Sequence, residues 1–154
     1  MSLQSTVDRW TERATDPEIA SQLADLVASG DASALEDAFF QDLSFGTAGL
    51  RGVLGPGTNR MNVYTVGKAT QGVANYLKSH FDAPTVAIAR DSRNNGELFV
   101  RTTAAILAAN GVRALLFPRI EPVPALSFAV RDLGASAGIV MTASHIPAAY
   151  NGYK

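Results

Sequence analysis

From residue 63 onward the sequence alternates between helical and strand periodicity, and this alternation constrains the fold more than any other feature. Apolar residues recur at helical spacing in 63–78, 98–109 and 122–133. Short apolar segments at 85–90, 114–117 and 137–143 lie between or after these helices and predict buried strands. Such an order predicts an α/β fold, a three-layer α/β/α domain around a mostly parallel (mixed) sheet.

The first forty residues favour helices instead. Asp16 and Pro17 form a helix start, because the carboxylate can cap the helix and proline fits its first turn. Gly30 is placed as the stop of that helix. The run 33–36 has the spacing of a capping box, which predicts a second helix reaching Phe40. We therefore divide the chain into an N-terminal helical segment, 1–44, and an α/β domain, 45–154.

The composition sets limits on partners and location. Of 154 residues 47% are hydrophobic, which is enough for a core, and the net charge of -1 attracts neither nucleic acid nor an anionic membrane. There are no cysteines, so disulfides and thiolate metal sites are excluded. No apolar run has the length of a membrane span, and the first residues lack the apolar core of a signal peptide. We predict a cytoplasmic protein without nucleic-acid or membrane partners.

The segment 45–57, FGTAGLRGVLGPG, contains five glycines and is predicted to be extended or looped. Its backbone amides could approach a phosphate closely, and Arg51 could grip phosphate oxygens. The glycine spacing matches neither a dinucleotide-binding loop nor a Walker loop. A flexible connection with one solvated arginine is the alternative.

Polar side chains follow two of the predicted strands. The triplet 91–93, Asp-Ser-Arg, follows the first, and Ser144 with His145 follows the third. Parallel strands would bring both clusters to one edge of the sheet, where open α/β sheets bind ligands. Ser144 is the candidate nucleophile, although a serine hydroxyl needs activation and a polar loop is the plainer interpretation. No Gly-x-Ser-x-Gly elbow surrounds Ser144, which disfavours a serine hydrolase.

Lys154 follows Asn151-Gly152, a turn dipeptide, and could fold back over the serine loop. A solvated surface lysine is the commoner case. The acidic residues are scattered, so any hard-metal site formed by this chain alone would be incomplete.

Two stretches together go beyond spacing. TASHIPAAYNGYK, residues 142–154, resembles the active-site serine loop of the α-D-phosphohexomutase superfamily, whose pattern is Thr-(Ala/Gly)-Ser-His-Asn-Pro followed by Tyr-Asn-Gly-x-Lys. FGTAGLRG resembles that family's N-terminal signature, and NRMN, TVGKATQGVANYL and ARDSR follow in family order. The similarity is greatest to the phosphoglucomutase/phosphomannomutase branch that includes phosphopentomutases, and it covers domain I, at 45–154.

The resemblance implies an isomerase in which Ser144 carries a phosphoryl group and binds Mg²⁺ through that phosphate. Arg51 and Lys154 would be the cationic residues near the transfer site, assisting proton movement and charge stabilisation, and His145 would orient and protonate groups there. The implied reaction moves phosphate between sugar positions, such as C1 and C6 of a hexose, through a sugar bisphosphate that also serves as activator.

The sequence departs from the family in two respects. Ile146 stands where the family usually has Asn, and it cannot make the amide hydrogen bonds that would shape the loop. The family's metal-binding, sugar-recognition and C-terminal phosphate-binding loops are not found, so we expect an N-terminal domain whose partners are the remaining C-terminal domains and a phosphosugar. We expect this domain to be inactive by itself; a non-catalytic phosphate- or sugar-binding module is the alternative. The sugar stays open among glucose, mannose and pentose phosphates.

Overall fold

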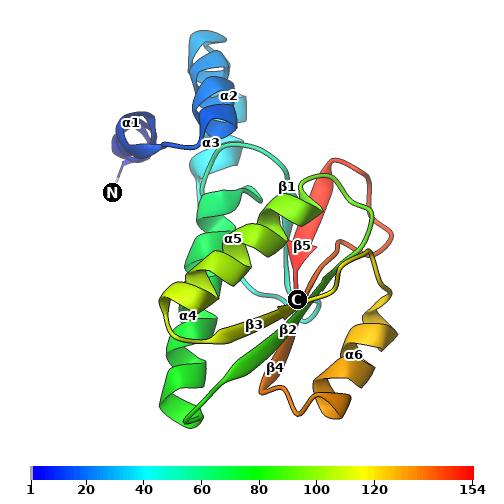
Figure 1. Ribbon diagram of the computed structural model, residues 1–154. Helices are drawn as coiled ribbons and strands as arrows, with labels where there is room; N and C mark the ends of the chain where they lie inside the picture. Colours follow the sequence, from blue (N-terminus) through cyan, green and yellow to red (C-terminus); the bar gives the residue numbers. More distant parts are fainter. Residues whose placement is uncertain (1) are drawn as a thin grey trace.

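A computed structural model of the chain, which describes residues 2–154, contains one mixed five-stranded sheet with helices on both faces (Figure 1). The elements in chain order are α1 Leu3–Arg13, α2 Pro17–Ala28, α3 Ala32–Phe39, β1 Leu50–Val53, α4 Val63–His80, β2 Thr85–Arg90, α5 Gly96–Ala109, β3 Arg113–Leu116, α6 Val123–Asp132, β4 Ala137–Met141 and β5 Tyr150–Tyr153. The strand order is β1-β5-β4-β2-β3.

The side chains of β2 alternate between two cores, and this produces three layers. Val86 and Ile88 pack into the larger core with residues of α4 and α5, whereas Ala87 and Ala89 pack with Leu126 of α6. Accordingly α4 and α5 lie on one face of the sheet and α6 on the other (Figure 1). The α/β/α prediction is therefore confirmed.

Strand directions also agree with a mostly parallel, mixed sheet. β2 pairs in parallel with both β3 and β4. β5 runs antiparallel to β4 and to β1, so the two strands at one side of the sheet complete it with antiparallel pairs. The carboxyl ends of β2 and β4 consequently point to the same edge.

The sequence-based helix boundaries were right at α2, whereas at α3 the end near Phe40 was right and the predicted start was wrong. The Asp16 carboxylate accepts the Ile19 amide at 3.0 Å, and Gly30 adopts φ +67° just after the helix. At α3 the cap is Asp31, whose carboxylate accepts the Ala34 amide at 3.0 Å, so the capping box predicted at 33–36 is not formed. Among residues 2–154, no helix combines the length and the apolar character that crossing a membrane requires.

The N-terminal helices rest on the beginning of α4 through one aromatic cluster. The Trp10 ring meets the rings of Phe39 and Tyr64 edge to face, with centroids 5.5 and 5.3 Å apart. The Tyr64 hydroxyl also accepts the Asp16 amide at 2.8 Å. These contacts join the helical segment to the α/β unit at the beginning of α4 (Figure 1).

Two of the strands were not predicted as strands from the sequence, although the segment that contains β1 was predicted to be extended or looped. β1 lies inside the glycine-rich segment, and β5 contains the Asn151-Gly152 pair that we predicted to be a turn. Asn151 is fully buried. Its side-chain Nδ2 donates to Asn94 O at 2.8 Å, and its side-chain Oδ1 accepts the Gly152 amide at 2.8 Å. A local turn preference is overridden here, because ladder pairing and burial stabilise the extended form.

Asn62 joins the start of α4 to the glycine-rich segment and generates a stability prediction. Its buried side-chain oxygen, Oδ1, accepts the backbone amides of Tyr64 and Thr65, each at 3.0 Å. Its side-chain nitrogen, Nδ2, donates to Gly55 O and Gly57 O at 2.9 and 3.0 Å. We expect Asn62→Ala to lower the free energy of unfolding by about 3 kcal/mol, because both a cap and buried partners are lost.

Urea unfolding followed by circular dichroism measures this loss. Asp31→Ala is the matched control, since it removes an exposed cap that binds nothing else, and it should cost about 1 kcal/mol. Equal losses in the two variants would show that the loop contacts of Asn62 contribute nothing.

Candidate functional site

The two polar clusters after β2 and β4 meet at one edge of the sheet, as the sequence analysis predicted. The Asp91 amide donates to Met141 O at 3.2 Å. The Thr142 hydroxyl donates to the Asp91 carboxylate, and the Arg93 guanidinium donates to Ser144 O at 2.7 Å. The edge therefore carries a connected polar network rather than two independent loops.

Ser144 protrudes from this network with an unusual backbone. Its side chain is exposed, and its φ of +61° lies in the left-handed region, which costs a non-glycine residue about 1–2 kcal/mol. The Ser144 amide donates to Thr142 Oγ1 at 3.0 Å, and Ser144 Oγ lies 3.3 Å from His145 Nδ1. Left-handed residues of this kind gather at functional sites. The hydroxyl is thus accessible and has a basic ring nitrogen beside it.

Arg51 reaches the same edge across β5. It pairs with Gly152 in the β1–β5 ladder, and the Thr142 amide donates to Gly152 O at 3.1 Å. A Cβ placed on Gly152 would stand 3.2 Å from Arg51 Cγ, 2.5 Å from Thr142 O and 2.8 Å from Leu50 O. Because Gly152 has no side chain, the Arg51 side chain can lie directly against the backbone of β5.

The Arg51 side chain carries an unpaired donor. Its Nε is buried and has no hydrogen-bond partner among residues 2–154. A buried donor without a partner costs about 1–3 kcal/mol, more if it is charged. A ligand with acceptor oxygens at this edge would supply the missing partner.

Lys154 lies at the end of β5, where its backbone pairs with Val140 through two hydrogen bonds of 2.9 and 3.1 Å. A Cβ on Gly49, which has φ +88°, would stand 2.7 Å from Lys154 Cγ. Burial and then the nearby Arg51 charge lower the pKa of the Lys154 ammonium, and the Asp91 charge opposes them. Two cations are thus held close enough to repel each other.

The glycine-rich segment offers fewer free backbone amides for binding a phosphate than we expected. The Gly46 and Gly49 amides donate to each other's carbonyls at 3.1 and 3.0 Å, and the Gly55 amide donates to Met61 O at 3.3 Å. These three amides are used to close the turns around β1, so they are not free for a phosphate. The segment positions Arg51 instead.

Three further residues of the site had no assigned role. Asp91 and Arg93 were noted only as part of a polar cluster, and Thr142 was quoted only within the serine-loop motif. The available signal was their place directly after β2 and β4. Their hydrogen bonds to the serine loop depend on strand register, which the sequence does not give.

A metal site is not complete in this part of the molecule. Within residues 2–154 no group of three or more His, Asp and Glu side chains is arranged to hold a metal ion. The Asp91 carboxylate, which is near Ser144 in the network, is already bonded to the Thr142 hydroxyl and the Arg93 amide.

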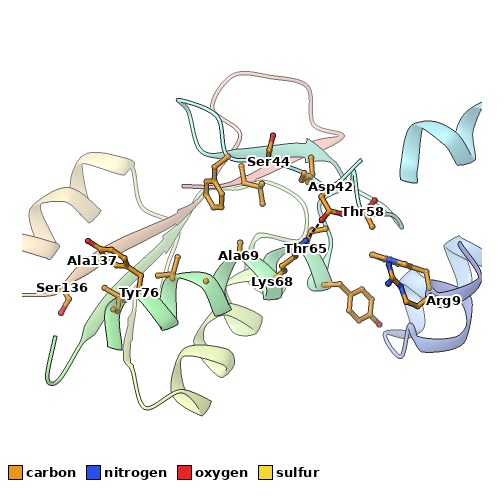
Figure 2. Close-up of a pocket in the computed structure, with 18 of the residues that line it drawn as sticks. Arg9, Asp42, Ser44, Thr58, Thr65, Lys68, Ala69, Tyr76, Ser136 and Ala137 are labelled. Atoms are coloured by element: carbon orange, nitrogen blue, oxygen red, sulfur yellow. Dashed lines mark hydrogen bonds and ion pairs between the residues drawn. The ribbon is translucent and has the colours of Figure 1, made fainter. Parts of the chain in front are cut away.

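A large hollow lies elsewhere in the molecule. A cavity of about 890 Å³ runs along α4, from Arg9 near one end to Ser136 and Ala137 near the other (Figure 2). Its walls are mainly apolar, with an ion pair between Lys68 and Asp42. None of Ser144, His145, Arg51 and Lys154 lines it. The residues predicted from the sequence therefore lie outside this cavity.

Comparisons with known proteins identify related sequences and folds. The family described as "Phosphoglucomutase/phosphomannomutase, alpha/beta/alpha domain I" matches residues 42–154. The "Probable phosphoribomutase" of Schizosaccharomyces pombe is 38% identical over 155 residues, covering 99% of this chain and 26% of its own length. The phosphoglucomutase of Staphylococcus haemolyticus is 40% identical over 147 residues, covering 96% of this chain and 26% of its own length.

A crystal structure of a related protein has a similar fold. A Thermus thermophilus protein assigned as a phosphomannomutase has a TM-score of 0.68 and 32% identity, covering 74% of this chain and 25% of the other. The chain thus spans about a quarter of the length of the relatives it matches.

The close approach at Gly152 generates a stability prediction. We expect Gly152→Ala to lower the free energy of unfolding by about 3 kcal/mol, because the added Cβ meets two backbone oxygens that cannot move independently. Gly72→Ala in α4 is the matched control, with nothing within 4 Å of the added Cβ, and should raise stability by about 0.5–1 kcal/mol. Urea unfolding of both variants checks this, and a tolerated Gly152→Ala would contradict the described packing.

The charge of Arg51 beside Lys154 generates a titration prediction. Arg51→Met should raise the pKa of Lys154, because one of the causes that lower it is removed. The pKa of Lys154 is lower in the folded chain than in the unfolded one, so the unfolded chain binds more protons at pH values between these two pKa values. The free energy of unfolding therefore rises with pH across that range, and Arg51→Met should make the range narrower. Carbon-13 NMR of reductively methylated lysines measures the pKa.

Arg101→Met serves as the control for this titration. Arg101 is exposed and pairs with Glu97 on α5, so its removal should leave the pKa of Lys154 where it was. If Arg51→Met also leaves the Lys154 pKa unchanged, the two cations are too far apart to interact.

Proposed function

Because this chain belongs to the phosphoglucomutase/phosphomannomutase family, matching its α/β/α domain I, we propose that it supplies the phosphoserine part of the active site of a phosphosugar mutase. In this proposal residues 45–154 form domain I and residues 1–44 form a helical segment packed against it. Ser144 carries the phosphoryl group, and Arg51, His145 and Lys154 act on it.

One observation carries the proposal: an exposed serine at a strand end lies in the same part of the sheet as Arg51 and Lys154, neither of which forms an ion pair within residues 2–154. Arg51 Nε is buried without a partner among residues 2–154, and the Arg51 charge lowers the pKa of Lys154. A phosphate dianion on Ser144 would supply acceptor oxygens and relieve the repulsion between the cations. Preorganised cations of this kind stabilise a transferring phosphoryl group.

In the proposed transfer, the bond between phosphorus and a sugar oxygen breaks while a bond forms between phosphorus and Ser144 Oγ. The proton of the Ser144 hydroxyl leaves, and the released sugar oxygen takes up a proton. In the opposite direction phosphoserine gives its phosphoryl group to a free hydroxyl of a sugar monophosphate, and that hydroxyl loses its proton. The sugar bisphosphate so formed then returns its other phosphoryl group to Ser144, which leaves the second monophosphate.

The surrounding residues fit these proton movements. His145 Nδ1, 3.3 Å from Ser144 Oγ, is placed to take the hydroxyl proton. Lys154, whose pKa is lowered by burial and by Arg51, gives up a proton more readily than an ordinary lysine and suits the leaving sugar oxygen. Arg51 stays charged and stabilises the developing negative charge.

The family is generally Mg²⁺-dependent, and the phosphate on Ser144 would be the ligand that this chain offers. The described residues do not complete a magnesium site.

The substrate class is a sugar phosphate, and the relatives suggest two candidates for its sugar. One relative is named a phosphoribomutase and another a phosphoglucomutase, so pentose and hexose phosphates both belong in the proposal. Because the relatives are about four times as long as this chain, remaining domains are the proposed partners and the mutase activity is proposed for the assembled protein. A cytoplasmic location stays a prediction.

Phosphorylation of Ser144 tests the proposed function. The chain, alone and fused to the remaining domains of a staphylococcal phosphoglucomutase, is incubated with Mg²⁺ and either glucose 1,6-bisphosphate or ribose 1,5-bisphosphate. We expect the mass of one phosphoryl group to be gained, peptide mapping to place it on Ser144, and the preferred bisphosphate to identify the sugar class.

Ser144→Ala is the control and should gain nothing. Bisphosphate that binds without labelling Ser144 in either preparation would support the binding-module alternative and contradict the donor role. Labelling at another residue would contradict the assignment of Ser144.

A further inference from the structure

The serine loop, which comprises residues 144–150, is held mainly by one side chain from a different part of the chain. Arg93 lies between β2 and α5, and its side chain is 12% exposed. Its Nη1 donates to Pro147 O and Tyr150 O, each at 3.0 Å. Its Nη2 donates to Ser144 O at 2.7 Å and to Ile146 O at 2.6 Å. One guanidinium therefore bonds four carbonyls of the loop.

This arrangement uses all four N–H groups of the two terminal nitrogens, because each carbonyl takes one of them. The remaining Nε lies 3.7 Å from an Asp91 carboxylate oxygen. Both terminal nitrogens of Arg93 are thus occupied by the loop, and only the Nε–H, which lies beside the Asp91 carboxylate, makes no hydrogen bond. Its contacts assign it to shaping the loop and not to binding the reacting group.

The anchor of Arg93 is itself fixed. The Arg93 amide donates to Asp91 Oδ1 at 3.0 Å, and Asp91 Oδ2 accepts the Thr142 hydroxyl. Thr142 Oγ1 in turn accepts the Ser144 amide at 3.0 Å. On the other side, Asn151 donates to Asn94 O at 2.8 Å. The segment 91–94 is consequently bonded to both ends of the serine loop.

These bonds explain how Ser144 stays in the left-handed region. Both of its flanking peptide groups are held, the amide by Thr142 and the carbonyl by Arg93. A residue with positive φ persists only where its surroundings over-determine it. Without Arg93 the carbonyl is released, and the exposed loop can satisfy its carbonyls with water and adopt other conformations.

The same contacts answer the question raised by Ile146. Arg93 bonds backbone carbonyls, including that of Ile146, and this hold does not depend on the side chain at position 146. An asparagine amide is therefore not required to shape the loop in this chain.

We propose that Arg93 is a positioning residue for phosphoryl transfer: it holds the serine loop so that Ser144 keeps its left-handed backbone and its Oγ stays exposed beside His145. The inference rests on the proposed function for its catalytic consequence, but the hold on the loop stands on the contacts alone. Two readouts separate these parts.

The first readout is amide hydrogen exchange in the 154-residue chain, resolved by NMR. In Arg93→Met, exchange at the loop amides should accelerate about tenfold or more, while amides of α4 and β2 keep their wild-type rates. Arg93→Lys keeps the charge but has three donors and no planar fork, so it should give an intermediate acceleration. It also serves as the second variant if Arg93→Met does not fold.

The second readout is the rate of Ser144 labelling at increasing glucose 1,6-bisphosphate, in the preparation that labels. Arg93→Met should lower the maximal rate about 100-fold, since small misplacements of a reacting group have effects of this size. The half-saturating concentration should stay within about twofold, because both terminal nitrogens of Arg93 are bonded to the loop and not to the sugar phosphate. Arg93→Lys should recover part of the maximal rate.

Two control variants frame these results. Arg101→Met removes an exposed arginine of α5 that bonds Glu97 and not the loop, so it should match the wild type in both readouts. Ile146→Asn should likewise leave loop exchange within about twofold, because the four carbonyls are untouched.

The outcomes are distinct. Wild-type loop exchange in Arg93→Met, or an unchanged maximal labelling rate, overturns the positioning role. A wild-type protein that bisphosphate never labels overturns the proposed function, and the exchange measurement then still decides whether Arg93 holds the loop.

Discussion

The site depends on the return of the chain as β5 between β1 and β4. This strand pairs antiparallel with both neighbours, and through its ladder Arg51 of β1 comes opposite Gly152, whose carbonyl accepts the Thr142 amide next to β4. Without this insertion Arg51 would be distant from Ser144, because most of the α/β domain separates them in sequence. Tyr153 anchors β5 from the other face: its buried hydroxyl lies 3.2 Å from the Thr70 hydroxyl, and burial raises the pKa of Tyr153 to about 12.

Three residues near β5 are held in energetically unfavourable states. Ser144 has a left-handed backbone, Arg51 has a buried donor without a partner within residues 2–154, and the pKa of Lys154 is lowered by burial and by Arg51. Each is tolerated because the surrounding hydrogen bonds and packing of a stable sheet offset its cost. All three would be relieved or used if a phosphate were bound at the edge, which is why the proposed function gives them a common explanation.

Much of the fold was predictable because its signals are local. The periodicities of 63–143 predicted the three parallel strands and the helices between them, and Asp16 with Pro17 predicted the start of α2. The misses have physical reasons. The capping box predicted at 33–36 is not formed because α3 already begins at Ala32, where Asp31 caps it. β1 and β5 are short, glycine-containing strands that are stable only as a pair with β4.

The sequence by itself determined which reactive groups exist and that Ser144 would follow a strand, because buried apolar runs and the residues after them are properties of a local segment. It also determined, through ordered motifs, the family to which the chain belongs. Only the tertiary structure decided that Asn151-Gly152 is a strand, that Arg51 lies across Gly152, and that Arg93 bonds four carbonyls of the serine loop. These facts depend on strand order and register, which arise from long-range pairing that no short stretch of sequence specifies.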